Sequence, residues 1–278
     1  MSKRGTSASK RLPGRFLASE LKLIMGRRRN QAGLAVLAAV PIVLAVAVAI
    51  WGSGGGPDLV SLVEGNGVFV PLAALGVEIA MFLPLAIAML SGDTIAGEAN
   101  LGTLRYLLAV PVGRTRLLLV KYASLCIGAF IGVGTIVVAG LVVGGLLFGL
   151  GPMTTLSGTQ LGLGTTLGRL VLGAAYLGCA LCAIAAVGLF VSTLTEQPIA
   201  ATIAVMIFVI LCTILGAIDQ LAWLHPWLIT NHLMAFIDVL RDPVPFDGML
   251  RGLGVFASYA VVFWLAAWAR FTTKDITN

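Results

Sequence analysis

The charged residues with the most informative spacing lie between Gly92 and Lys121, in the stretch GDTIAGEANLGTLRYLLAVPVGRTRLLLVK. They are Asp93, Glu98, Arg105, Arg114, Arg116 and Lys121. Long apolar runs flank this stretch on both sides, and charged side chains are costly in hydrocarbon, so we expect it to leave the membrane. We also expect it to be the place where the protein meets a partner.

The sequence contains none of the common catalytic motifs. It has no G-x-x-x-x-G-K-[ST] phosphate-binding loop, so the chain is not expected to bind ATP in that way. It has no H-E-x-x-H zinc motif, and its two histidines, His225 and His232, both precede the last apolar run. No Ser, His and Asp constellation stands out. We therefore expect no catalytic site and no metal or cofactor on this chain.

Two further groups within the apolar runs could do chemistry. Glu78 lies about nine residues into its run, which is roughly 14 Å deep at 1.5 Å per helical residue. It is either a contact along a transport path or a protonated or hydrogen-bonded packing residue. Cys179 and Cys182 form C-x-x-C, which permits a redox or soft-metal site, and the alternative is inert buried thiols.

The elements that position these residues are membrane helices. The chain is 59% apolar and 11% charged, with a mean hydropathy of +1.02, which excludes a water-soluble domain. Roughly 20 helical residues cross a hydrocarbon core of about 30 Å. Six apolar runs are long enough: Gly33–Trp51, Phe69–Leu90, Tyr122–Leu150, Leu170–Leu194, Ile199–Ile218 and Leu253–Ala269. Their continuous apolar character predicts an all-α integral membrane protein.

The basic residues predict the orientation of these six spans. Fifteen of the 18 Lys and Arg residues fall on one side, and only Arg169, Arg241 and Arg251 fall on the other. Basic residues gather on the cytoplasmic side, so both termini should be cytoplasmic in a multi-pass protein of the cell membrane. The net charge of +6 then reflects topology and contact with anionic lipid, and nucleic acid is not an expected partner.

An amphipathic helix is expected before the first span. Leu17, Leu21, Ile24 and Met25 share one helical face, and basic residues occupy the other. Such a helix lies on the membrane surface, either as a lipid anchor or as an elbow that also touches a cytoplasmic partner. A cleaved signal peptide is disfavoured, because the apolar run that follows is too long.

The predicted organisation has three parts. Residues 1–32 form a cytoplasmic tail and the amphipathic helix, residues 33–269 form one six-helix domain, and residues 270–278 form a second cytoplasmic tail. The domain includes an inner loop, 92–121, and an outer cap, 219–252, where aromatic residues and prolines favour interfacial helices. In the inner loop, Asp93 or Thr94 should cap a short helix that ends at a break around Gly102.

The inner loop resembles the type-2 ABC exporter permeases, the membrane subunits that pair with separate nucleotide-binding subunits. The resemblance rests on the pattern E-x3-GTL-x2-LL-x2-PV-x-R-x6-K, formed by Glu98, Gly102, Thr103, Leu104, Leu107, Leu108, Pro111, Val112, Arg114 and Lys121. The basic amphipathic N-terminal helix with Glu20 and Leu21, the six spans, the outer cap and the closing segment from Arg270 to Ile276 are further points of likeness.

The resemblance implies an ATP-driven exporter of lipophilic or amphiphilic cargo. Two permeases, identical or homologous, would face each other above two ATPase subunits, which bind the ATP and Mg²⁺. A coupling helix in the inner loop would contact the ATPase, with Glu98 and Arg105 as polar contacts, and Leu101 and Leu104 filling its groove. The candidate coupling residues are Thr94, Glu98, Leu101, Gly102, Thr103, Leu104, Arg105 and Arg114, and Glu78 is a candidate for the translocation path.

Three other functions stay open. An ion-coupled secondary transporter would work without an ATPase, but more than one membrane-embedded acidic residue would be typical of it. A membrane-embedded enzyme is disfavoured by the missing motifs. A permease-like subunit could also sense a membrane-active compound, or confer resistance to it, with little net transport.

Overall fold

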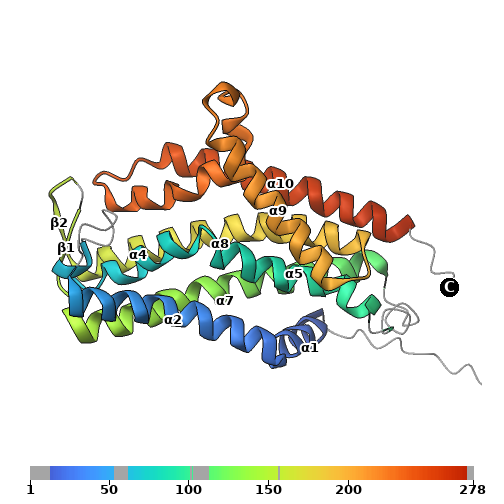
Figure 1. The fold of residues 1–278 in the computed structure, drawn as a ribbon, viewed down its shortest axis with the longest axis horizontal. Coiled ribbons are helices and arrows are strands. Elements are labelled where there is room, and N and C mark those ends of the chain that lie inside the picture. The colour runs from blue at the N-terminus through green and yellow to red at the C-terminus, as the bar shows by residue number, and fades with distance from the viewer. Residues whose placement is uncertain (1–12, 53–61, 101, 103–112, 156, 274–278) are drawn as a thin grey trace, which may run out of the picture.

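Long apolar helices dominate the computed structural model, which describes residues 13–52, 62–100, 102, 113–155 and 157–273 (Figure 1). In chain order the α-helices are α1 (Pro13–Gly26), α2 (Arg28–Trp51), α4 (Phe69–Glu78), α5 (Phe82–Asn100), α7 (Arg114–Phe148), α8 (Leu163–Leu194), α9 (Pro198–Gly216) and α10 (Phe246–Thr273). The short elements are the 3-10 segments η1 (Leu62–Gly65), η2 (Asp219–Leu221), η3 (His225–Trp227) and η4 (Ile229–Leu240), and strands β1 (Met153–Thr154) and β2 (Gln160–Leu161).

Five helices are long and apolar enough to cross a membrane: α2, α7, α8, α9 and α10. The pair α4 and α5 passes the same test together, which allows up to six spans. The expectation of an all-α membrane protein is therefore confirmed at this level. One small difference is the two-residue antiparallel pairing of β1 with β2, in which Met153 lies opposite Leu161.

The second predicted span is broken. Helices α4 and α5 meet at an angle of 61°, with a turn at 79–81 between them. Pro84 explains the break, because a proline ring clashes with the carbonyl four residues earlier, here that of Ala80, and proline has no N–H to donate. The sequence signal for this break was present as a proline within an apolar run.

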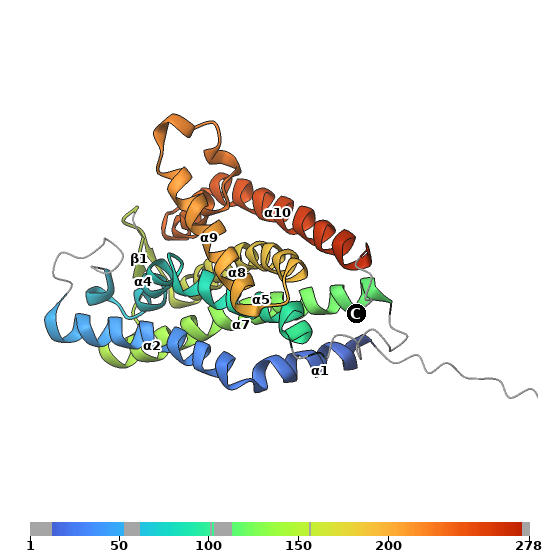
Figure 2. The ribbon, with the colours of Figure 1, turned by 45° about the vertical axis from the view of Figure 1, so that its right-hand side comes forward.

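Helix α8 forms the centre of the bundle and packs against α5, α7, α9 and α10. Helices α2 and α7 lie on one side of it, and α9 and α10 lie on the other (Figures 1 and 2). The outward faces of these flanking helices carry large exposed apolar side chains such as Val43, Ile199 and Val261. Exposed apolar side chains on every flank are the surface that a lipid-facing bundle requires.

The two ends of the bundle are built differently. Helix α1, the end of α5, the start of α7 and the end of α10 lie at one end, on the right of Figure 1. We call this the N-terminal end. At the other end, the Asn66 amide donates to the carbonyls of Gly151 and Pro152, at 2.8 Å and 3.2 Å. The segment that follows α9 projects from the bundle in both views (Figures 1 and 2).

Candidate functional site

A buried ion-pair network occupies the N-terminal end of the bundle. Lys121, in the second turn of α7, is only 3% exposed. Its Nζ lies 2.5 Å from Glu98 Oε1 at the end of α5 and 3.7 Å from Glu20 Oε2 in α1. Burying a charge is costly unless it is paired, so these contacts hold three helices together at one point.

A second ionic contact lies beside the first. Arg27 Nη1 is 3.3 Å from Asp93 Oδ2, and the Arg29 guanidinium also pairs with that carboxylate. The two contacts join the start of α2 to α5. Together the two groups contain three anions and three cations, so the charge within the network is balanced. We use the term ionic cluster for these six residues: Glu20, Arg27, Arg29, Asp93, Glu98 and Lys121.

A cavity of about 30 Å³ separates the two halves of the ionic cluster. Glu20, Arg27, Asp93, Glu98 and Lys121 line it, together with Thr94. A single water needs about 10–15 Å³ by the same measure, so the cavity has room for about two waters. The space therefore suits hydration of the charges and is too small for an organic ligand.

The predicted coupling residues that the structure describes have mostly internal contacts. Thr94 lies inside α5, and its hydroxyl donates to the Leu90 carbonyl at 3.0 Å. The expected separate short helix starting at Asp93 or Thr94 is therefore wrong, because α5 runs without interruption to Asn100. Asp93 pairs with Arg27 and Arg29 from within this continuous helix.

The predicted break near Gly102 is confirmed. Gly102 has φ +66°, a left-handed conformation that favours glycine and ends helices, and its N–H donates to the Ala99 carbonyl at 3.0 Å. An added Cβ at Gly102 would meet nothing within 4 Å. The remaining predicted coupling residues, Leu101, Thr103, Leu104 and Arg105, lie outside the described residues.

Arg114 joins the start of α7 to the end of the last helix. Its Nη1 donates to the carbonyls of Thr272 and Phe271, at 2.9 Å and 3.4 Å. A cation at these carbonyls compensates the negative end of the α10 dipole. Trp268 Nε1 donates to Thr115 Oγ1 at 2.9 Å and adds a second contact between the same helices.

Ser192 is a functional candidate that the sequence analysis missed. Its hydroxyl donates to the Gly92 carbonyl at 2.9 Å and accepts from the N–H groups of Ile95 and Ala96, at 3.1 Å and 2.9 Å. The side chain of Ser192 in α8 is thus inserted into the hydrogen-bond ladder of α5, which loosens a helix locally. No sequence signal marks a single serine for this role.

Glu78 is the last residue of α4 and lies directly before the bend. It is completely buried, and within the described ranges neither carboxylate oxygen has a hydrogen-bond partner. The charged residues on the elements packed against α4 lie near helix ends, as with Arg28 and Arg29 of α2 and Lys121 of α7. A carboxyl in these surroundings is far cheaper to bury as the uncharged acid.

The cysteines form no metal site in the part of the chain that the structure describes. Cys126, Cys179, Cys182 and Cys212 are free thiols. Across the described residues, no group of three or more His, Cys, Asp or Glu side chains is arranged to hold a metal ion. The ionic cluster, the Ser192 insertion and Glu78 are three polar features inside this bundle.

Comparison with known proteins gives a family and no activity. Residues 72–277, about three quarters of the chain, match the model of a family described as "Protein of unknown function (DUF2705)". No curated protein matches. The matched range includes Glu78, Asp93, Glu98 and Lys121, whereas Glu20, Arg27 and Arg29 lie before it. The chain belongs to the DUF2705 family.

Proposed function

We propose that this chain is the membrane-spanning permease subunit of an ATP-driven exporter of the type-2 ABC class. The observation that carries the proposal is the pairing of Glu98 with Lys121. These are the first and last residues of the pattern that resembles the coupling segment. The pair holds the end of α5 close to α7, so a partner that binds between these two helices would act on both of them at once.

Contacts around the Glu98 and Lys121 pair connect it to other helices of the bundle. Glu20 adds α1 to the same ionic contact, and Ser192 joins α5 to the central helix α8. Arg114 adds the end of α10. A nucleotide-dependent difference in the free energy of ATPase binding is what could shift these helices between two arrangements. In this proposal Glu98 acts inside the permease, and Leu101, Leu104 and Arg105 supply the contacts with the ATPase.

The proposed complex contains two ATPase subunits, which bind ATP and Mg²⁺, and a second permease that is identical or homologous. The apolar character of the second and fifth predicted spans favours lipophilic or amphiphilic cargo such as a drug, lipid or peptide. Efflux and multidrug resistance are the processes that such a cargo class suggests.

The test first asks whether a neighbouring gene encodes a nucleotide-binding ATPase, and it then uses the full chain together with that ATPase. ATP-dependent uptake of a lipophilic dye into inverted vesicles should require both proteins. Leu104→Asp should abolish co-purification of the ATPase and dye uptake, because a charge cannot fill an apolar groove. The matched control is Thr273→Asp, at an exposed position on the same end of the bundle. Co-purification and uptake that survive Leu104→Asp would contradict the proposal.

A second candidate function rests on Glu78. A buried carboxyl at the bend of a broken span, with no hydrogen-bond partner among the described residues, is a feature that proton-coupled and cation-coupled secondary transporters can use. Such a transporter would move dye under a proton gradient without ATP or a neighbouring ATPase, and Glu78→Gln would stop it. Dye uptake that needs ATP and survives Glu78→Gln would exclude this function.

A further inference from the structure

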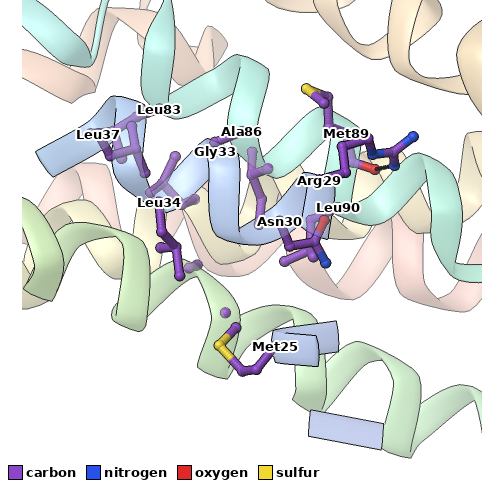
Figure 3. Close-up of a pocket in the computed structure, with 14 residues that line it drawn as sticks. Met25, Arg29, Asn30, Gly33, Leu34, Leu37, Leu83, Ala86, Met89 and Leu90 are labelled. Carbon is purple, nitrogen blue, oxygen red and sulfur yellow. Dashed lines mark hydrogen bonds between the residues drawn. The ribbon is translucent and has the colours of Figure 1, made fainter. Parts of the chain in front are cut away.

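An apolar cavity of about 70 Å³ opens between α2 and α5, next to the ionic cluster but separate from the small polar cavity within it (Figure 3). Its walls come from α2, α5, α7 and α8, with Met25 of α1 at one edge. In Figure 3, Gly33, Leu34 and Leu37 of α2 lie near Leu83, Ala86 and Leu90 of α5.

The two ends of this cavity differ in burial and in polarity. Leu37, Leu83 and Leu181 form a fully buried, apolar inner end. Arg29 and Asn30 lie at the other end, where Arg29 is exposed and Asn30 is half-buried. Arg29 and Leu37 are eight residues apart on one helix, about 12 Å, against a half-thickness of about 15 Å for the hydrocarbon core. With Arg29 in the headgroup layer, the cavity would extend towards the bilayer centre.

Basic residues adjoin the mouth of the cavity, which Arg29 lines. Arg27, Arg28 and Arg29 are consecutive, and Asp93 is the acidic residue that pairs with two of them. Within the described part of the chain, Arg28 takes no part in an ion pair and is exposed. Arg29 also reaches across the mouth to the Met89 carbonyl at 3.5 Å, which fixes its guanidinium beside the opening (Figure 3).

We propose that this cavity binds one acyl chain of an anionic phospholipid, with the lipid phosphate beside Arg28 and Arg29. An aqueous solute has no polar partner at the buried inner end, whereas an acyl chain needs none. A probe-sized group occupies about 10–15 Å³ by this measure, so the cavity holds about five methylene groups of a chain whose remainder lies outside it. The guanidinium groups provide the donors and the charge that a phosphate accepts.

Gly33 makes this proposal testable by cavity filling. An added Cβ at Gly33 meets nothing within 4 Å, so Gly33→Leu can place its side chain in the space without a backbone clash. Gly134 on α7 has equally open surroundings and does not line the cavity, so Gly134→Leu is the matched control. Native mass spectrometry of the full chain in detergent with added phosphatidylglycerol should show a retained lipid adduct in the wild type and the control, and a loss of at least about fivefold in Gly33→Leu.

The headgroup preference is tested separately with Arg28→Gln, which leaves the cavity intact. One basic residue near a membrane surface contributes about 1 kcal/mol to binding of anionic lipid, so preference for phosphatidylglycerol over phosphatidylcholine should fall about fivefold. Equal retention of both lipids by the wild-type chain would overturn the anionic specificity. Equal lipid retention by Gly33→Leu and the wild type would overturn the site.

Photolabelling then places the bound chain. A phosphatidylglycerol with a diazirine near the end of its acyl chain should label peptides that contain Leu37 or Leu83, and one with a diazirine near the headgroup should label Met25 or Asn30. Labelling confined to outward-facing positions such as Val43, Ile199 and Val261 would contradict the proposal. None of these measurements uses ATP or an ATPase, so failure of the exporter proposal would leave them unaffected.

Discussion

At the scale of single residues, the burial of a charged side chain, rather than its position in the sequence, decides which partner it contacts. Glu98 is predicted from the sequence to contact an ATPase, and in the structure its side chain is 14% exposed and pairs with Lys121. Glu20 was noted only as part of the N-terminal helix, and it adds the second carboxylate to that cation. Pairing of this kind depends on which helix faces meet, and the spacing of charges along the chain does not report it.

Replacement of Lys121 should show how much this ionic contact contributes to the stability of the fold. Lys121→Met leaves two carboxylates buried without their cation, and breaking a buried pair in this way costs about 3–5 kcal/mol. The double variant Lys121→Met with Glu98→Gln removes both charges of the close pair and should recover most of the loss. Thermal unfolding in detergent measures both effects. A Lys121→Met variant as stable as the wild type would show that the pair does not stabilise the fold.

Glu78 should behave as an uncharged acid. Its carboxyl is completely buried and has no hydrogen-bond partner in the described structure, which favours the protonated form. A hydrophobic carbodiimide, which reacts with protonated carboxyls in membranes, should therefore modify Glu78 and leave Glu78→Gln unmodified. Peptide mass spectrometry locates the adduct. Equal modification by a water-soluble carbodiimide would show that water reaches the site.

At the scale of elements, contacts near helix ends hold the bundle together. Arg169 in the first turns of α8 donates to the Arg241 carbonyl and to Asp242 Oδ1, both at 2.7 Å. These bonds join α8 to the segment between η4 and α10. At the opposite end, Arg114 and Trp268 join α7 to α10. The sequence indicated a polar outer cap at 219–252, but it did not indicate that Arg169 would anchor it.

The Arg169 contact predicts a pH dependence. Its hydrogen bonds hold the pKa of Asp242 below the usual value. Since the folded-state pKa is depressed, the contact stabilises the fold above the usual pKa of Asp and is lost as pH falls through the lowered value. Asp242→Asn should therefore lower the melting temperature at pH 7, and the difference from the wild type should close below about pH 4. The exposed Asp219→Asn is the control, and a difference that persists in acid would contradict the prediction.

Close helix approach predicts a second effect at this scale. An added Cβ at Gly144 of α7 would lie 2.2 Å from the Gly67 carbonyl oxygen, next to the start of α4. Gly144→Ala should therefore force the two segments apart and lower the melting temperature, since overpacking costs about 1–3 kcal/mol. Gly134→Ala on the same helix meets open space and should have little effect. Equal melting temperatures for the two variants would show that α4 and α7 do not pack closely at Gly144.

At the scale of the whole molecule, the basic residues are distributed unequally between the two ends of the bundle. The ionic cluster, Arg114 and Arg270 lie at the N-terminal end, whereas Arg169, Arg241 and Arg251 belong to the opposite part of the chain. The predicted topology puts 15 of the 18 basic residues on one side of the membrane. Because basic residues gather on the cytoplasmic side, that side would face the cytoplasm. A bundle with six spans also returns both termini to one side.

Cysteine accessibility tests this orientation. In a background without native cysteines, Ser157→Cys between β1 and β2 should react with a membrane-impermeant maleimide in intact cells. Gly113→Cys, directly before α7, should react only after the membrane is permeabilised. Both positions are exposed, so a difference in labelling reports the side of the membrane. The reverse pattern would invert the topology and would place the proposed ATPase contact on the wrong side.

The sequence by itself determined the membrane class, the approximate position of each span and the break at Gly102. These follow from local properties, because hydropathy and backbone preference belong to a segment whatever surrounds it. Tertiary structure alone decided that Lys121 pairs with Glu98 and Glu20, and that Ser192 enters the ladder of α5. It also decided that an apolar cavity opens beside Arg29. Each of these depends on which faces of distant helices meet, and no local pattern carries that information.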